Sequence, residues 1–191
     1  DDTLLMGNIP IVNPVSPSYV GLTASQSAVS FESVEVFGGI VDNPETDIET
    51  TANINANSAT GTWLVDDGII TQTDTEKTDY VAGTGFAGEQ FTIGVDIKLP
   101  PDVSDAGAGL IFHMSGRDDR TQGYMVRFGS GGNELFWGQY TEDGTFSGDG
   151  GVPTEIDPQE AQRLQLIVSE STFDIRVNGE TLVEAIPLQR A

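Results

Sequence analysis

Apolar and polar residues alternate along most of the chain from residue 62 onward. In residues 91–99, Phe91, Ile93 and Val95 alternate with polar or small residues, and the run ends at Pro100. Alternation with a period of two predicts a half-buried β-strand. Shorter runs of the same kind, separated by Gly, Asp, Asn and Ser, occur at residues 110–114, 124–128, 135–137, 164–168, 173–177 and 181–186. This pattern predicts an all-β sandwich of antiparallel strands.

Three connections between these runs can be assigned from composition. Asn178-Gly179 predicts a tight hairpin, because both residue types tolerate the positive φ that such a turn needs. The glycine-rich stretch at Gly148–Gly151 is interpreted as a loop. Residues 157–163 are the one predicted helical turn, since Asp157 can cap it and Pro158 suits the first helical position.

The N-terminal part contains two further strand candidates, residues 19–22 and 29–36. In the second, Val29 and Phe31 are in one phase of the alternation, whereas Val34 and Val36 are in the other. This change of phase predicts a β-bulge near Glu32-Ser33. Residues 40–61 have few large apolar side chains and are typical of a linker. We therefore divide the chain into an N-terminal strand-bearing arm (1–39), a linker (40–61) and a sandwich (62–191).

The charge balance excludes several classes of partner. The chain has 30 acidic and 8 basic residues, which gives a net charge of −22. Such a field repels nucleic acids and anionic lipid headgroups, so neither nucleic-acid binding nor membrane insertion is expected. There is no cysteine, so thiols neither prove nor exclude an oxidising compartment. The chain begins at Asp1 without an initiator Met and has no apolar run of 18 residues, which favours a processed protein that is extracellular or attached to the cell surface.

Several motifs carry a resemblance to a known superfamily. They are Trp63–Ile70, the strand at 91–99, Gly109-Leu110-Ile111-Phe112, Gly123-Tyr124 and Phe173–Gly179. With these motifs, residues 62–186 resemble the concanavalin-A-like/laminin-G-like jelly-roll superfamily, and specifically the domain associated with 3-keto-disaccharide hydrolases. The resemblance implies an antiparallel two-sheet jelly roll.

The order of the strands departs from that superfamily. Such domains close with a Gly-x-x-Gly-Leu element and a final Val-x-Phe-x-x-Val-x-Val strand, which runs along the edge beside the first strand. Here the matching segments, Tyr19–Leu22 and Val29–Val36, stand at the N-terminus. The resemblance therefore implies that residues 62–191 lack their final strand. The residues expected to fill that place are Tyr19, Val20, Leu22, Val29, Phe31, Val34 and Val36.

A sandwich without its last strand exposes apolar side chains and unpaired backbone groups, so another strand must complete it. The same chain could supply that strand, a neighbouring copy could supply it, or the sequence could be an excerpt of a tandem array. Only donation by a neighbour produces a head-to-tail polymer. The leading hypothesis is therefore a non-catalytic structural subunit of an extracellular filament or surface assembly that polymerises by donor-strand complementation.

The alternative hypothesis is a carbohydrate-binding or adhesion module of a larger secreted protein. Trp137 and Tyr140 are its candidate glycan-stacking residues, although Trp137, like Trp63, suits a core position at least as well. An enzyme is a third hypothesis, because Glu45-Thr46-Asp47-Ile48-Glu49 matches the carboxylate spacing of some retaining glycosidases. That motif needs a strand, however, and here it lies in the linker, so catalysis is not expected.

Calcium is the one candidate cofactor, because lectin-like jelly rolls often bind this ion through hard oxygen ligands. The candidate ligands are two pairs of neighbouring carboxylates, Asp66 with Asp67 and Asp118 with Asp119. Neither pair has the spacing of an EF-hand loop, and each is more typical of a plain acidic turn than of a calcium site.

Overall fold

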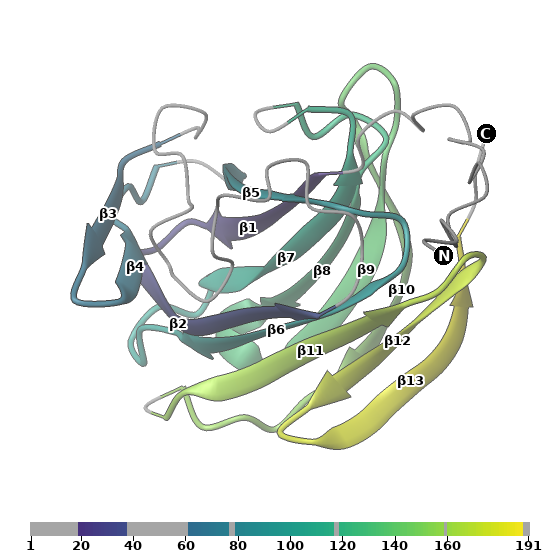
Figure 1. The fold of residues 1–191 in the computed structure, drawn as a ribbon. Coiled ribbons are helices and arrows are strands. Elements are labelled where there is room, and N and C mark those ends of the chain that lie inside the picture. The colour runs from purple at the N-terminus through teal and green to yellow at the C-terminus, as the bar shows by residue number, and fades with distance from the viewer. Residues whose placement is uncertain (1–18, 38–60, 77–78, 117–118, 159, 189–191) are drawn as a thin grey trace, which may run out of the picture.

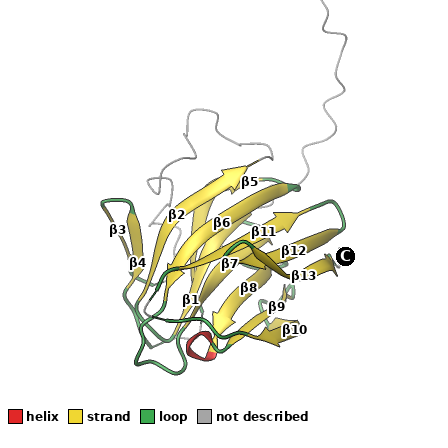
Figure 2. Ribbon diagram, turned by 90° about the horizontal axis from the view of Figure 1, so that it is seen from below, coloured by secondary structure: helices red, strands yellow, loops and turns green. Residues whose placement is uncertain are grey.

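The computed structural model describes residues 19–37, 61–76, 79–116, 119–158 and 160–188, and it confirms the predicted all-β fold. Two antiparallel sheets pack face to face in a sandwich (Figure 1). The helix drawn in Figure 2 is a short 3-10 turn, η3 (Ser130–Gly132). Within the described ranges, no helix is long and apolar enough to span a bilayer.

The first sheet has six strands, all of which pair antiparallel with their neighbours. In spatial order they are β10 (Phe146–Pro153), β9 (Glu134–Tyr140), β8 (Tyr124–Gly129), β7 (Gly107–Met114), β1 (Tyr19–Ser25) and β5 (Tyr80–Ala87).

The second sheet has seven strands, which are also antiparallel throughout. In spatial order they are β13 (Glu180–Pro187), β12 (Thr172–Val177), β11 (Gln162–Val168), β6 (Phe91–Lys98), β2 (Val29–Phe37), β4 (Ile69–Gln72) and β3 (Trp63–Asp66).

The main core lies between the two sheets and is built from the alternate residues that the sequence pattern marks as apolar. Ile93 and Val95 of β6, for example, are fully buried, as are Leu164 and Leu166 of the neighbouring β11. Burial of such side chains stabilises a fold by about 1.5–3 kcal/mol each. The alternation of the strands is thus the physical origin of the sandwich.

A second, smaller apolar cluster forms on the outer face of the six-stranded sheet. In β1 the side chains of Leu22 and Ala24 face the main core, so Thr23 between them faces outward, and yet it is 0% exposed. Its surroundings are the buried residues Val81, Ile111, Met114, Met125 and Tyr140. The outer face of this sheet is therefore not an ordinary solvated surface.

Most predicted strands are present, but two of the predicted connections are wrong. The glycine-rich stretch Gly148–Gly151 is part of β10 and pairs with β9. Residues 157–163 form no helix in the described part, because β11 begins at Gln162. The side-chain amide of Gln162 donates to the carbonyl oxygens of Asp157 and Glu160, which fixes an irregular connection instead. The Asn178-Gly179 turn is confirmed, with φ of 51° and 84°.

The bulge predicted in β2 is also confirmed. Glu32 lies opposite Asp96 and Glu35 lies opposite Gly94, so β2 has one more residue than β6 over this stretch. Ser33 within it has a φ of 49°. The extra residue shifts the phase of the alternation, so that Val34 and Val36 pack against the same core as Phe31. If Ser33 were paired as in a regular strand, Val34 and Val36 would point to the solvent.

Insertion of one alanine after Ser33 tests this role of the bulge. It adds a second extra residue and turns Val34 and Val36 away from the core, and we expect the free energy of unfolding to fall by about 2–4 kcal/mol. Deletion of Ser33 is the matched control, because without the extra residue Phe31, Val34 and Val36 alternate without interruption and keep facing the core, so that it should cost at most about 1 kcal/mol. Urea denaturation of both variants measures the difference. Equal stability of the insertion variant and the control would contradict the assigned register.

Candidate functional site

The residues expected to complete the sandwich occupy interior positions in both sheets. β1 pairs with β5 on one side and with β7 on the other, and β2 pairs with β4 and β6. The expected place at one sheet edge differs from the observed one, because β1 lies next to the edge strand β5 of its sheet, and β2 lies between β6 and the β4–β3 pair in the other. In the single chain described here, β1 and β2 complete the sheets of their own chain (Figure 1).

The position of β1 is formed by backbone pairing on both sides and by the burial of its apolar side chains in the core. Val20 and Leu22 are 0% exposed and face the second sheet. The hydroxyl of Thr84 in β5 donates to the carbonyl oxygen of Val20 at 2.7 Å. Tyr19, the first residue of β1, is half-buried and packs against the outer apolar cluster instead. β1 thus contributes side chains to both faces of its sheet.

The position of β2 is formed mainly by aromatic and aliphatic packing. Val29 and Phe31 are almost completely buried, and the ring centroid of Phe31 lies 5.9 Å from that of Trp63 in β3. Val34 and Val36 are half-buried and also contact the core. All seven residues selected from the sequence therefore belong to one continuous interface between residues 19–37 and the rest of the sandwich.

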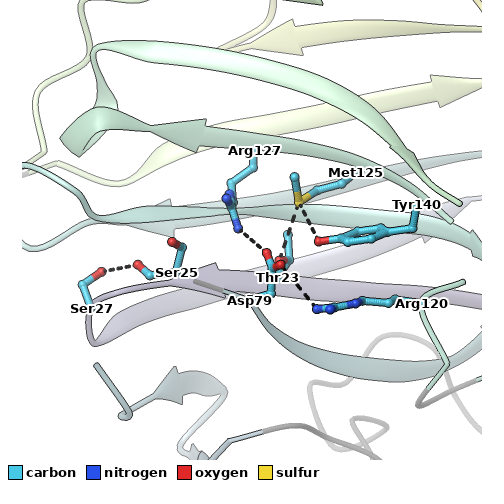
Figure 3. Close-up of polar contacts among 8 residues, drawn as sticks. All are labelled: Thr23, Ser25, Ser27, Asp79, Arg120, Met125, Arg127 and Tyr140. Carbon is cyan, nitrogen blue, oxygen red and sulfur yellow. Dashed lines mark hydrogen bonds and ion pairs between the residues drawn. The ribbon is translucent and has the colours of Figure 1, made fainter. Parts of the chain in front are cut away.

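Beside β1, a cluster of charged and aromatic side chains covers the outer face of the six-stranded sheet (Figure 3). The carboxylate of Asp79 lies 3.1 Å from Nη1 of Arg127 and 3.4 Å from Nη1 of Arg120. The guanidinium of Arg120 lies 4.8 Å from the ring centroid of Tyr140. The cluster joins β8 and β9 to residue 79, which immediately precedes β5.

Sulfur contacts connect this cluster to β1. The hydroxyl groups of Tyr140 and Thr23 both point to Sδ of Met125, at 3.6 and 3.9 Å (Figure 3). Burial, and next the negative charge of Asp79, raises the pKa of Tyr140 well above its usual value. Tyr140 is therefore neutral throughout the physiological range, and it acts as a packing residue under the Arg120 guanidinium.

The two candidate glycan-stacking residues have different surroundings. Tyr140 is 1% exposed, so neither face of its ring is open to a sugar. Trp137 is partly buried and packs against the main core, where its ring fills the space above Gly150 of β10. An exposed aromatic platform, which stacking on a sugar requires, is not formed by this pair.

The carboxylates considered for calcium lie in turns. Asp66 and Asp67 are exposed at the β3–β4 hairpin, where Asp67 and Gly68 have φ of 45° and 81°. The Asp119 carboxylate accepts hydrogen bonds from the backbone N–H and hydroxyl of Thr121, which lower its pKa. Asp118 lies outside the described residues. No group of three or more His, Asp or Glu side chains suitable for a metal occurs in the described part of the chain.

The carboxylate motif considered for glycosidase chemistry, Glu45–Glu49, also lies outside the described residues. His113 is half-buried on β7, and its Nε2 lies 3.2 Å from the carbonyl oxygen of Glu89. No motif or spacing in the sequence marks Asp79, Arg120 or Arg127 as members of a site. The rarity of basic residues, 8 in 191, is the one signal in the sequence that could have drawn attention to these arginines.

No known protein family, curated protein or solved structure matches this chain. The β-sandwich is therefore supported by the structure alone, and the finer assignment to a laminin-G-like jelly roll with a 3-keto-disaccharide hydrolase-type domain remains an expectation.

Substitution of Asp79 by Asn tests whether the charged cluster stabilises the outer face. Arg127 is 11% exposed, and the change removes a carboxylate that neutralises it. We expect the free energy of unfolding to fall by about 1–3 kcal/mol in urea denaturation. Asp102→Asn is the matched control, because Asp102 is exposed in the turn after β6. If both variants unfolded at the same urea concentration, the cluster would not contribute to stability.

Proposed function

We propose that this chain is a structural subunit of an extracellular filament or surface assembly, and that it polymerises by donor-strand complementation. Residues 19–37 of one copy occupy the β1 and β2 positions of the next copy. The observation that carries the proposal is the interior location of both strands. The partner is therefore another copy of the chain, and the role is structural and not catalytic.

Interior strands are indispensable in a way that edge strands are not. Without β1, the hydrogen-bonding edges of β5 and β7 are unpaired, and without β2 the same holds for β4 and β6. Unpaired backbone groups next to an apolar core are costly, and exposed edges recruit other strands. A sandwich whose own N-terminal strands are engaged elsewhere therefore has a strong requirement for the strands of a neighbour.

The connection after β2 is longer than closure within one chain requires. β2 starts opposite the end of β4, where β3 also begins, because Val29 pairs with Gln72 and Gln72 pairs with Trp63. From there β2 runs past the turn of the β3–β4 hairpin, and its last residue, Phe37, pairs with Thr92 of β6. From strand geometry, the end of β2 and the start of β3 are about 30 Å apart. The segment 40–61 can span roughly 70 Å when it is extended. That reach is sufficient for the next subunit.

Donation from each copy to the next is a head-to-tail contact. Such a contact uses different surfaces on its two sides, so it continues into an open filament unless the rotation between copies closes a ring. The β3–β4 hairpin offers additional apolar surface, since Leu64, Val65 and Ile69 are 54%, 44% and 39% exposed. Packing between subunits would bury this surface.

An engineered disulfide between β2 and β6 tests the proposal in the full-length chain, which contains no cysteine. Ser30 and Lys98 are direct partners across the two strands, at a Cα separation that suits a disulfide. In the Ser30→Cys/Lys98→Cys variant, donation between copies links successive chains. We expect a ladder of covalent multimers in a denaturing, non-reducing gel, and filaments in electron micrographs of the same sample.

The matched control is Thr92→Cys/Ile167→Cys, which pairs β6 with β11 inside the sandwich. This disulfide joins two residues of one chain whichever chain supplies β2, so it must migrate as a single chain. If the Ser30→Cys/Lys98→Cys variant also gave only cross-linked single chains, closure would be intramolecular and the proposed polymerisation would be wrong.

A further inference from the structure

A single arginine on the outer face of the seven-stranded sheet contacts β2 at its bulge. Nη1 of Arg163 in β11 donates to the carbonyl oxygen of Ser33 at 2.7 Å, and Nη2 donates to the Glu35 carboxylate at 2.6 Å. Nη1 also lies 3.3 Å from the Asp96 carboxylate of β6. One guanidinium therefore connects three neighbouring strands across the sheet.

The arginine reaches β2 because the residue that it crosses is glycine. Gly94 of β6 lies between Glu35 of β2 and Gln165 of β11. A Cβ atom on Gly94 would lie 2.7 Å from Nη2 and 2.9 Å from Cζ of Arg163. Any other residue at position 94 would displace the guanidinium. The glycine therefore leaves the space through which the Arg163 side chain crosses the outer face of β6.

These contacts recognise features that belong to one register of β2 only. The Ser33 carbonyl is available because the bulge turns this residue out of the ladder, with a φ of 49°. Glu35 comes opposite Gly94 only after the extra residue of the bulge. A shift of β2 by two residues would keep the apolar phase but would separate both groups from Arg163.

We propose that Arg163, held by Asp96 and placed over Gly94, is the residue that selects the incoming β2 strand and sets its register. This inference rests on the proposed function, since the selected strand then belongs to a neighbouring copy. Many strands with alternating apolar residues could pack against the core. A strand that also has a bulge carbonyl, followed two residues later by a glutamate, can be distinguished from these by Arg163. The partner is thus identified by this pairing of charge and bulge.

Charge reversal on either side tests the inference by complementation. A chain with Glu35→Arg brings an arginine to Arg163, and a chain with Arg163→Glu brings a glutamate to Glu35, so each should assemble poorly alone. In a mixture of the two variants, both donations restore an opposite-charge pair. The arginine at position 35 of one chain meets the glutamate at position 163 of the other, and Glu35 of that other chain meets Arg163. Co-refolding the two variants from urea should give alternating filaments.

Single cysteines make the choice of partner measurable. The Glu35→Arg chain carries Ser30→Cys and the Arg163→Glu chain carries Lys98→Cys, so a disulfide records each donation from the first to the second. We expect about tenfold more cross-linked dimer from this pair than from the Glu35→Arg donor mixed with an acceptor that keeps Arg163. Glu180→Arg, an exposed reversal at the β12–β13 turn, replaces Glu35→Arg in the control donor. This donor keeps Glu35, so it should show the opposite preference and cross-link better to the acceptor that keeps Arg163.

The outcomes separate this inference from the proposal on which it rests. If the Ser30→Cys/Lys98→Cys variant forms a ladder but the charge-reversed pair shows no preference, Arg163 does not select the strand. The proposed polymerisation is then still supported. If no ladder forms, donation between copies fails and the inference fails with it. Gly94→Ala gives a second measurement without a change of charge, and it should reduce cross-linking in the wild-type background about as much as Arg163→Glu does.

Discussion

The whole fold depends on the burial of residues 19–37 between strands that are far away in sequence. Leu22 and Phe31 are completely buried, one in each sheet, and they face a common core. Each burial contributes about 1.5–3 kcal/mol, and the two strands also pair four neighbouring strands. The remaining residues have apolar faces of the correct pattern, but they can form two continuous sheets only around these strands. The N-terminal segment is therefore a structural requirement of the sandwich.

Apolar burial alone does not determine where β2 lies along its neighbours. An alternating strand can shift by two residues and still present its apolar side chains to the core. The bulge at Ser33 limits the possible shifts, because the phase changes at one position only. On the outer face of the sheet, Arg163 donates hydrogen bonds to the Ser33 carbonyl and to Glu35, and these bonds form only when the bulge lies opposite Arg163. The core thus provides affinity, whereas the polar outer face provides register.

The sequence predicts those parts of the fold in which apolar residues alternate, and even the bulge in β2 could be located from the phase of four residues. It does not predict β5 and β10, because the glycines in these strands have no side chains that would make an alternation visible: Gly83 and Gly85 in β5, and Gly148, Gly150 and Gly151 in β10. The interior location of β1 and β2 depends on long-range pairing, which leaves no local signal. For the same reason, the contacts of Asp79 with two arginines and of Arg163 with Glu35 could not be predicted from spacing.

The contacts of β1 and β2 are the same whether the strands come from the same chain or from a neighbour, so the connection after β2 determines the choice. A tethered strand competes with free copies through its effective concentration, which falls when the tether is stretched. The segment 40–61 contains Asp42, Glu45, Asp47 and Glu49 and no basic residue, in a chain with a net charge of −22. Repulsion among like charges stiffens a charged tether. Because dissolved salt screens charges over about 8–10 Å, its removal strengthens this repulsion. Under the proposed donation between copies, the linker charge acts through the tether alone, because the body of a neighbour is as acidic as the chain's own body.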